Sequence, residues 1–472
     1  MNGAVQLPLD LDELTITASG GSLVRRSVLP SGVRILSEQV PGSQSATVGF
    51  WVAVGSRDEE PVTYGSTHFL EHLLFKGTTS RTALEIAVAF DSVGGEHNAM
   101  TAKEYTCYYA KVRDQDLAMA VGVLADMFTS SLLDVDEFEA ERGVILEELA
   151  MADDDPSDVV SERLFEAVFG DHPLGRPIGG SPASISAVDR NAVMAHYRAN
   201  YRPQDLVISV AGAVDHELLV RWVTDALKAA GWDLSGAAAP VARRNAVVGL
   251  IDRGSPLAFV KRPTEQANLL LGVAGLPATD PRRATLVVLN SVLGGGMSSR
   301  LFQEVREKRG LAYSVYSFAA SYADAGLMGL YAGCSPKNAT AVADLMMAEF
   351  RRRAADGITD EELSRAQGQL GGGSALALED SDTRMTRLGR SELTFGEFAD
   401  LDETLRRIGL VTTCDVHALA ADLVARPLSF AAVVALDPGA FDALVATGST
   451  TWAASTTGAT STTGATSTAG AA

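Results

Sequence analysis

The chain has 472 residues, of which 46% are hydrophobic and 21% are charged, and its formal net charge is -20 at pH 7. This length exceeds what one ordinary core accommodates and predicts two domains of about two hundred residues each. The negative charge argues against nucleic acid or an anionic membrane as a partner, and no run of about 18 apolar residues predicts a membrane-spanning helix.

The first ten residues and the cysteines bear on location. Residues 1–10 carry no basic segment and their apolar run is interrupted, so neither a secretory signal nor an Arg-rich transit peptide is expected. Cys107, Cys334 and Cys414 are odd in number and lack metal-ligand spacing, which favours a reducing compartment over a disulfide framework. Both features predict a cytoplasmic protein.

Residues 66–78 contain the most informative motif of the chain. His68, Glu71 and His72 form His-x-x-Glu-His, the inverted form of the zinc-peptidase helix signature. Apolar residues fill the other faces and Gly77 follows as a stop signal, so the stretch predicts a buried helix. On a helix the two histidines lie one turn apart on one face with Glu71 beside them. Burying these three side chains is costly unless they are paired or bind a metal, which favours a metal site.

A second acidic helix is expected at residues 135–151. Two histidines leave a catalytic zinc one protein ligand short, and a carboxylate is the usual third. Glu141 and Glu148 are seven residues apart on one face of this helix, and Glu148 lies in an otherwise apolar turn. On spacing alone Glu147 is a competing candidate, and the alternative is an ordinary solvated acidic face, which fits Glu137 and Glu139 better than Glu148.

The chain repeats itself at a fixed offset. The apolar strand that ends at Asp215 reads like the one that ends at Asp437, and the runs leading to Asp58 and Asp280 are separated by the same offset (437 minus 215 equals 280 minus 58). We therefore expect an α+β fold with two homologous domains, each a mainly antiparallel sheet with helices packed on one face. Helices are predicted at residues 83–93, 116–130, 135–151 and 359–370.

The motif, the acidic segment Glu141–Glu148 and the two similar halves together resemble the insulinase/pitrilysin family of zinc metallopeptidases, in particular its short branch related to mitochondrial processing peptidase. The resemblance spans about residues 25–445. The spacing from His72 to Glu148, and that from Glu141 to Glu148, both match the family's pattern. The resemblance therefore implies one Zn²⁺ per chain, held by His68, His72 and Glu148, with Glu141 supporting a ligand.

Residues 94–101 also fit this family. They look like its Gly-Gly-x-x-Asn-Ala-x-Thr segment, which leads into an edge strand that pairs with the substrate backbone. The resemblance implies that Asn98, Ala99 and Thr101 bind substrate by strand addition, in which main-chain hydrogen bonds give affinity.

Two features of the second half match the family as well. Arg306 and Tyr313 resemble a pair that reaches the substrate near the scissile bond, where both can donate to a carbonyl oxygen that gains charge. Gly294, Gly295 and Gly296 occupy the place of a glycine-rich loop and are expected to contact substrate. This loop lacks the Lys-Ser/Thr of a phosphate loop, so nucleotide binding is not expected.

The domain boundaries follow from the repeat and from composition. We expect an N-terminal extension over residues 1–24, a catalytic zinc-binding domain over 25–234, a linker over 235–247, a homologous non-catalytic domain over 248–446, and a disordered Ser/Thr/Gly/Ala tail over 447–472. At the repeat offset His68 aligns with Asn290 and His72 with Gly294, so the second half keeps the shape without the chemistry.

Together these features predict a zinc metalloendopeptidase in which a zinc-bound water attacks the scissile carbonyl and Glu71 is the general base. A zinc site, an Arg-Tyr pair and a glycine loop in one chain favour a homodimer, whose chamber would admit extended peptides or unfolded segments. The alternatives are a non-catalytic structural or partner subunit of the same family, and an active subunit that needs a different partner chain.

Overall fold

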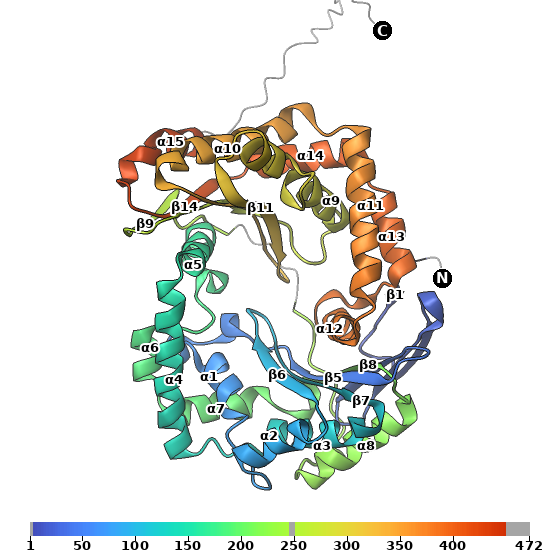
Figure 1. Cartoon of the computed structure of the whole chain (residues 1–472). Helices are drawn as coiled ribbons and strands as arrows, with labels where there is room; N and C mark the ends of the chain where they lie inside the picture. Colours follow the sequence, from blue (N-terminus) through green and yellow to red (C-terminus); the bar gives the residue numbers. More distant parts are fainter. Residues whose placement is uncertain (1–2, 245–250, 450–472) are drawn as a thin grey trace, which may run out of the picture.

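The computed structural model describes residues 3–244 and 251–449, which form two α+β halves that face one another (Figure 1). In the described residues the first half carries a seven-stranded sheet. Its strands, in spatial order, are β2 (Glu13–Thr17), β3 (Leu23–Val28), β4 (Arg34–Gln39), β8 (Leu206–Gly212), β5 (Ser45–Val52), β7 (Thr106–Arg113) and β6 (Glu96–Thr101). Only the β4–β8 pair of this sheet is parallel, so the expected mainly antiparallel sheet is confirmed.

The described part of the second half carries a five-stranded sheet. Its strands, in spatial order, are β11 (Ala312–Ser321), β12 (Gly326–Cys334), β10 (Ala267–Ala274), β14 (Leu428–Val434) and β9 (Leu257–Lys261). Here β14 and β9 are the parallel pair. The repeat offset is visible in the strands themselves, because β10 begins as far after β5 as β14 begins after β8 (267 minus 45 equals 428 minus 206).

Helices follow the strands in both halves. Those of the first half are α1 (Ser66–Leu73), α2 (Ala83–Asp91), α3 (Leu117–Ser130), α4 (Val135–Asp154), α5 (Pro156–Phe169), α6 (Pro182–Ala187), α7 (Arg190–Asn200) and α8 (His216–Ala229). Those of the second half are α9 (Arg283–Gly294), α10 (Ala339–Asp356), α11 (Asp360–Ala377), α12 (Ser381–Arg390), α13 (Leu401–Gly409), α14 (Thr413–Val424) and α15 (Asp442–Ser449).

The helix predicted for the His68–His72 motif is α1, and the four other predicted helices correspond to α2, α3, α4 and α11. The largest difference is at the end of α11, which continues through three successive glycines, Gly371–Gly373, that local propensity would read as a stop. The α11 helix packs on α9 and α13, and a Cβ added at Gly371 would lie 3.2 Å from Leu405 of α13. None of the described helices is both long and apolar enough to cross a membrane.

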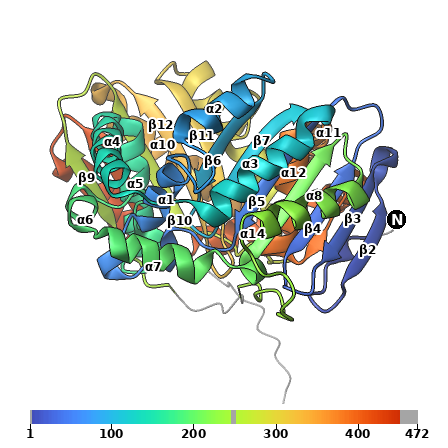
Figure 2. The ribbon, with the colours of Figure 1, turned by 90° about the horizontal axis from the view of Figure 1, so that it is seen from below.

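Each sheet is covered on one face by helices of its own half. Figure 2 shows α3 and α8 lying across the first sheet, which they contact at β5, β7 and β4. Phe50 of β5, Tyr108 of β7 and Phe128 of α3 are buried together in this core. In the second half α10 and α14 pack on one another and on the sheet in the same manner.

The other face of each sheet is covered by a helix from the opposite half, which the sequence analysis did not predict. Figure 1 shows α5 lying against the second sheet at β14, and α12 lying against the first sheet near β8. Met385 and Leu388 of α12 are buried with Trp51 of β5. In the reciprocal contact, Leu164 of α5 lies over Gly272 of β10, where an added Cβ would be 2.9 Å from the leucine side chain.

A buried carboxylate also joins the halves. Glu392, in the π-helix Ser391–Phe395 that follows α12, is fully buried. Its oxygens accept hydrogen bonds from Arg26 (3.1 and 3.3 Å), Arg34 (3.5 Å) and Arg243 (3.1 Å). Arg26 and Arg34 belong to β3 and β4 of the first sheet, so this cluster fixes the end of α12 on that sheet.

Two of the expected boundaries lie within elements of the fold. The boundary at residue 25 lies within β3, and part of the expected 1–24 extension forms β2, whose alternating apolar and polar residues suit an edge strand. At the other end, α15 continues to Ser449, beyond the expected start of the tail at residue 447. Residues 245–247 of the expected linker and 450–472 of the expected tail lie outside the described residues.

We expect Glu392→Gln to lower the free energy of unfolding by about 3–5 kcal/mol, because it leaves the buried Arg26 and Arg34 without a counter-charge. Chemical denaturation at neutral pH measures this loss. The control is Glu217→Gln, which removes an exposed partner of Arg25 and should cost less than about 1 kcal/mol. Equal losses in the two variants would contradict the assigned role of Glu392.

Candidate active site

The position of α1 is set by its start. The helix follows Gly65, whose φ of +92° and close contact with Ile185 leave no room for a side chain. The carboxylate of Glu59 accepts hydrogen bonds from the backbone N–H groups of Gly65 (2.9 Å) and Thr67 (2.7 Å), which satisfies donors at the helix N-terminus. The apolar side of α1, which includes Phe69, is buried in the first core. His68, Glu71 and His72 consequently occupy the remaining face of this helix.

The opposing wall is α4. Phe138, Glu141 and Ile145 are its buried residues, and their spacing of three and four places them on one face of the helix. Phe138 stacks on Phe69 of α1 with ring centroids 4.3 Å apart. The next position on this face is Glu148, which therefore lies opposite the histidines.

The structure brings His68, His72 and Glu148 together. The candidate ligand atoms of the three residues all lie within 4.8 Å of one another. The Glu148 Oε2 atom is 3.3 Å from His72 Nε2 and 3.6 Å from His68 Nε2. Glu147, the alternative on spacing, is exposed and is not part of this group.

Glu141 orients His72. Its carboxylate lies 2.9 Å from His72 Nδ1 and also pairs with Lys76. Because a carboxylate accepts, Nδ1 carries the proton and the Nε2 lone pair points to the group formed with His68 and Glu148. The side chain of Glu141 is 5% exposed and that of Glu148 is 53% exposed, so the two acids of one helix have different environments.

The donor set fits zinc. Burial lowers the pKa of His68 and the neighbouring His72 lowers it further, so this imidazole is neutral near pH 7, the form that binds a metal. Its buried Nδ1 has no hydrogen-bond partner among the described residues. Two imidazole nitrogens and one carboxylate oxygen are the protein ligands of many catalytic zinc sites.

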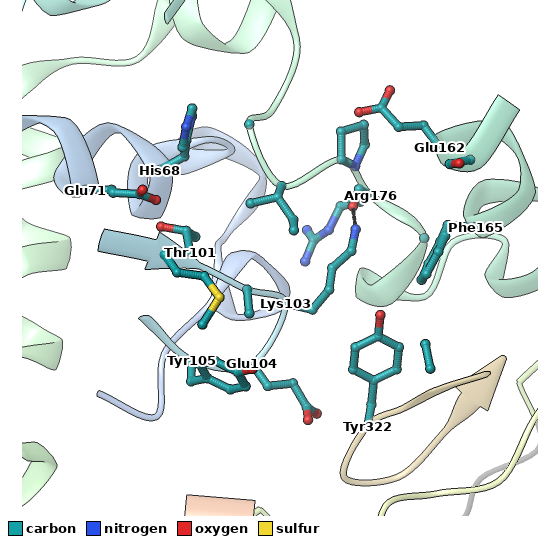
Figure 3. Close-up of a pocket in the computed structure, with 18 of the residues that line it drawn as sticks. His68, Glu71, Thr101, Lys103, Glu104, Tyr105, Glu162, Phe165, Arg176 and Tyr322 are labelled. Carbon is teal, nitrogen blue, oxygen red and sulfur yellow. Dashed lines mark hydrogen bonds between the residues drawn. The ribbon is translucent and has the colours of Figure 1, made fainter. Parts of the chain in front are cut away.

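His68 and Glu148 of this group, together with Glu71, line a cavity of about 810 Å³ between the two halves, part of which is drawn in Figure 3. Figure 3 shows His68, Glu71 and Thr101 on one side of this cavity, and Lys103, Phe165 and Tyr322 on the other. The lining comes from α1, β6, α4 and α5 of the first half and from β11 and the end of α12 of the second.

The strand β6 forms one wall of this cavity. Among the described strands it pairs only with β7, so its outer edge is free. Ala99 and Thr101 line the cavity, together with Met100, whereas Asn98 lies on the same strand outside the lining. A free strand edge beside the candidate metal ligands is the geometry that strand addition requires.

Other predicted substrate contacts lie elsewhere. Arg306 donates to the backbone carbonyl of Tyr313 (3.1 Å) and lies 4.6 Å from the centroid of its ring, so this pair is formed, but neither residue lines the cavity. The Gly294–Gly296 loop does not line it either. A Cβ on Gly294 would collide with the backbone nitrogen of Ser317, so close packing of α9 on β11 already requires this glycine.

Sequence reasoning missed the residues that close the cavity. The Glu104 carboxylate accepts from the backbone N–H of Ala323 (3.1 and 3.0 Å) and pairs with Arg57, which also binds Asp324 (2.9 Å). Burial lowers the pKa of Lys103 to about 8. Their position in the sequence could have indicated them, because Lys103 and Glu104 directly follow the segment 94–101 that is predicted to bind substrate.

Comparison with known proteins gives the family. The model of the insulinase family (peptidase family M16) matches residues 34–181, and the model of the peptidase M16 inactive domain matches residues 187–370. An uncharacterized zinc protease of Streptomyces coelicolor is 49% identical over 414 residues, which cover 88% of this chain and 90% of that protein. The chain belongs to the insulinase family. An uncharacterized zinc protease of Bacillus subtilis, another relative, is 38% identical over 87% of this chain and 98% of its own length.

Solved structures agree on the insulinase-family fold. A peptidase M16 inactive domain from Pseudomonas fluorescens has a TM-score of 0.78 at 19% identity, covering 88% of this chain and 98% of its own. A protease from Helicobacter pylori has a TM-score of 0.78 at 22% identity, covering 87% and 99%. The resemblance noted in the sequence is therefore confirmed at the level of family and fold.

For this insulinase-family chain we expect Glu141→Ala to weaken zinc binding by about 10- to 100-fold, because His72 loses the acceptor that orients it. Competition with a chelator measures the affinity, and metal analysis should give one zinc per wild-type chain. Glu148→Ala should lose most of the metal, whereas Glu147→Ala, the matched control on the same helix, should bind zinc as wild type does. Loss of zinc in the Glu147 variant would overturn the ligand assignment.

Proposed function

We propose that the chain is a zinc-dependent endopeptidase of the insulinase family that cleaves extended peptides or unfolded segments. One observation carries the proposal: His68, His72 and Glu148 converge beside Glu71 at a cavity that has a free strand edge as one wall. The names of the relatives support the same activity.

The proposed roles follow from these positions. His68, His72 and Glu148 would hold zinc. When bound, this ion would lower the pKa of a water molecule and polarise a peptide carbonyl. Glu71 takes a proton from the attacking water and passes it to the leaving amine. Glu141 holds His72 in the tautomer that leaves Nε2 free.

Substrate binding is proposed to use the edge of β6. A peptide added to this edge would lie along Asn98, Ala99 and Thr101 with its backbone hydrogen-bonded to the strand. The cavity lies between two halves of one chain, so it favours an extended segment over a folded protein. Arg306 and Tyr313, and the Gly294–Gly296 loop, would contact parts of the peptide beyond this cavity.

We further propose that the chain works as a cytoplasmic homodimer of the processing-peptidase-like branch. The support is the presence in one chain of the metal group and of the Arg306–Tyr313 pair. Light scattering on the purified protein tests it: a homodimer has twice the chain mass of 49.6 kDa.

We expect Glu71→Gln to lower kcat by at least about a hundredfold, because the amide cannot take up the proton, while zinc content and thermal stability stay as in wild type. The assay is cleavage of a quenched fluorescent peptide library, with and without a zinc chelator. Glu147→Gln, an exposed amide substitution on α4, is the matched control and should cleave normally.

The outcomes of this assay separate the alternatives. Retained activity in Glu71→Gln would contradict the proposed role of Glu71 as general base. No cleavage by a zinc-loaded wild-type chain would favour a subunit that requires a different partner chain. A chain that binds no zinc at all would favour the non-catalytic structural subunit.

A further inference from the structure

Three cationic side chains line the cavity, and two of them are already committed to acceptors of the protein. Lys103 Nζ donates to the backbone carbonyl of Arg176 and lies 5.3 Å from the ring centroid of Phe165. The guanidinium of Arg176 donates to the backbone carbonyls of Glu59 (3.2 Å) and Arg57 (3.0 Å). The third cation, Arg390, has no such partner among the residues that the structure describes.

Arg390 is the last residue of α12, where it lines two cavities at once. One is the cavity of the candidate active site, and the other is an adjoining cavity of about 460 Å³ within the second half. Ala319 and Ser321 of β11 also line both cavities, so the two spaces meet at Arg390. The side chain also lies close to Tyr105 of the first half. Burial raises the pKa of this tyrosine, and the positive charge of Arg390 lowers it in part.

The contacts of Arg390 leave its donors unused. Its guanidinium lies 5.5 Å from the ring centroid of Phe395, and its buried Nε has no acceptor in the part of the chain that the structure describes. By contrast Arg387, one turn earlier on α12, binds both oxygens of Glu38 (3.0 and 2.9 Å). A guanidinium carries five N–H donors, and leaving buried donors without acceptors is costly.

The other arginines of the adjoining cavity cannot take the same role. Besides Arg390, its lining includes Arg283, Arg387 and Arg407. Arg283 and Arg407 both pair with Glu397, and Arg387 pairs with Glu38. Of the four arginines that line the adjoining cavity, Arg390 alone has no carboxylate partner among the described residues.

We propose that Arg390 binds a carboxylate of the peptide substrate at a position away from the scissile bond. This carboxylate is then a determinant of substrate specificity. The inference rests on the proposed peptidase function, since the ligand is the peptide that occupies the cavity. A carboxylate matches the planar fork of a guanidinium with two parallel hydrogen bonds, which a single backbone carbonyl cannot do. Two sources carry this chemistry: the C-terminus of a short peptide, or an Asp or Glu side chain.

The test uses two pairs of labelled peptides. One pair differs only in a C-terminal carboxylate or amide, and the other, amidated, differs only in a Glu or Gln at one internal position. Binding is measured by fluorescence anisotropy on the zinc-loaded, full-length Glu71→Gln protein, so that no peptide is consumed. In at least one pair, the peptide with the carboxylate should bind about tenfold tighter or more.

The ratio of the two affinities within a pair should fall close to one when Arg390→Gln is added to the Glu71→Gln protein. Arg390→Lys should give an intermediate ratio, because a lysine keeps the charge without the planar fork of a guanidinium. Arg198→Gln, which changes an exposed arginine on α7, is the control and should keep the ratio. The pair that shows the effect identifies the source of the carboxylate.

Equal binding within both pairs, or a preference that survives Arg390→Gln, would overturn the inference. Failure of the proposed function has a different signature, because zinc-loaded wild type would then cleave none of the peptides, including the neutral ones.

Discussion

The two sheets each bury their second face under a helix that belongs to the other half, and the candidate site depends on this exchange. The α5 helix covers the second sheet with Leu164 and presents Phe165 to the cavity. The α12 helix covers the first sheet with Met385 and Leu388 and ends at Arg390 in the same cavity. Packing that closes two hydrophobic cores therefore also sets the distance between the cavity walls, since rigid packed helices cannot shift independently of the sheets that they cover.

The periodicity of two helices places His68, His72 and Glu148 opposite one another. On α1 one face enters the core and the other carries the two histidines, and on α4 the buried positions lead to Glu148. The difference in exposure between Glu141 and Glu148 follows from their depth between the two helices. The buried carboxylate of Glu141 is held by His72 and Lys76, as a group that orients a ligand would be, whereas the exposed carboxylate of Glu148 faces both histidines.

The sequence predicted the parts that depend on local patterns. The spacing of His68, Glu71 and His72, the internal repeat and the edge strand all have signatures within one or two elements. The exchanged packing has no such signature. The α12 helix is mostly polar, with Met385 and Leu388 as its buried large apolar residues, and the apolar residues of α5 do not indicate which sheet they cover. For the same reason the sequence does not show that Arg390 lacks an acceptor in the described part of the chain, because the neighbours of its guanidinium depend on the tertiary fold.

The exchange also makes closure of each core depend on contacts between residues that are far apart in the chain. The Ser429 hydroxyl on β14 donates to the backbone carbonyl of Ala167 on α5, a contact between residues 262 positions apart in the chain. During synthesis the first half emerges with its own sheet exposed on the side that α12 will cover, and it cannot complete its core until almost the whole chain has been made. Such long-range closure slows folding and leaves apolar surface open to aggregation in the meantime. The two similar halves are thus packed so that neither hydrophobic core is closed without a helix of the other half.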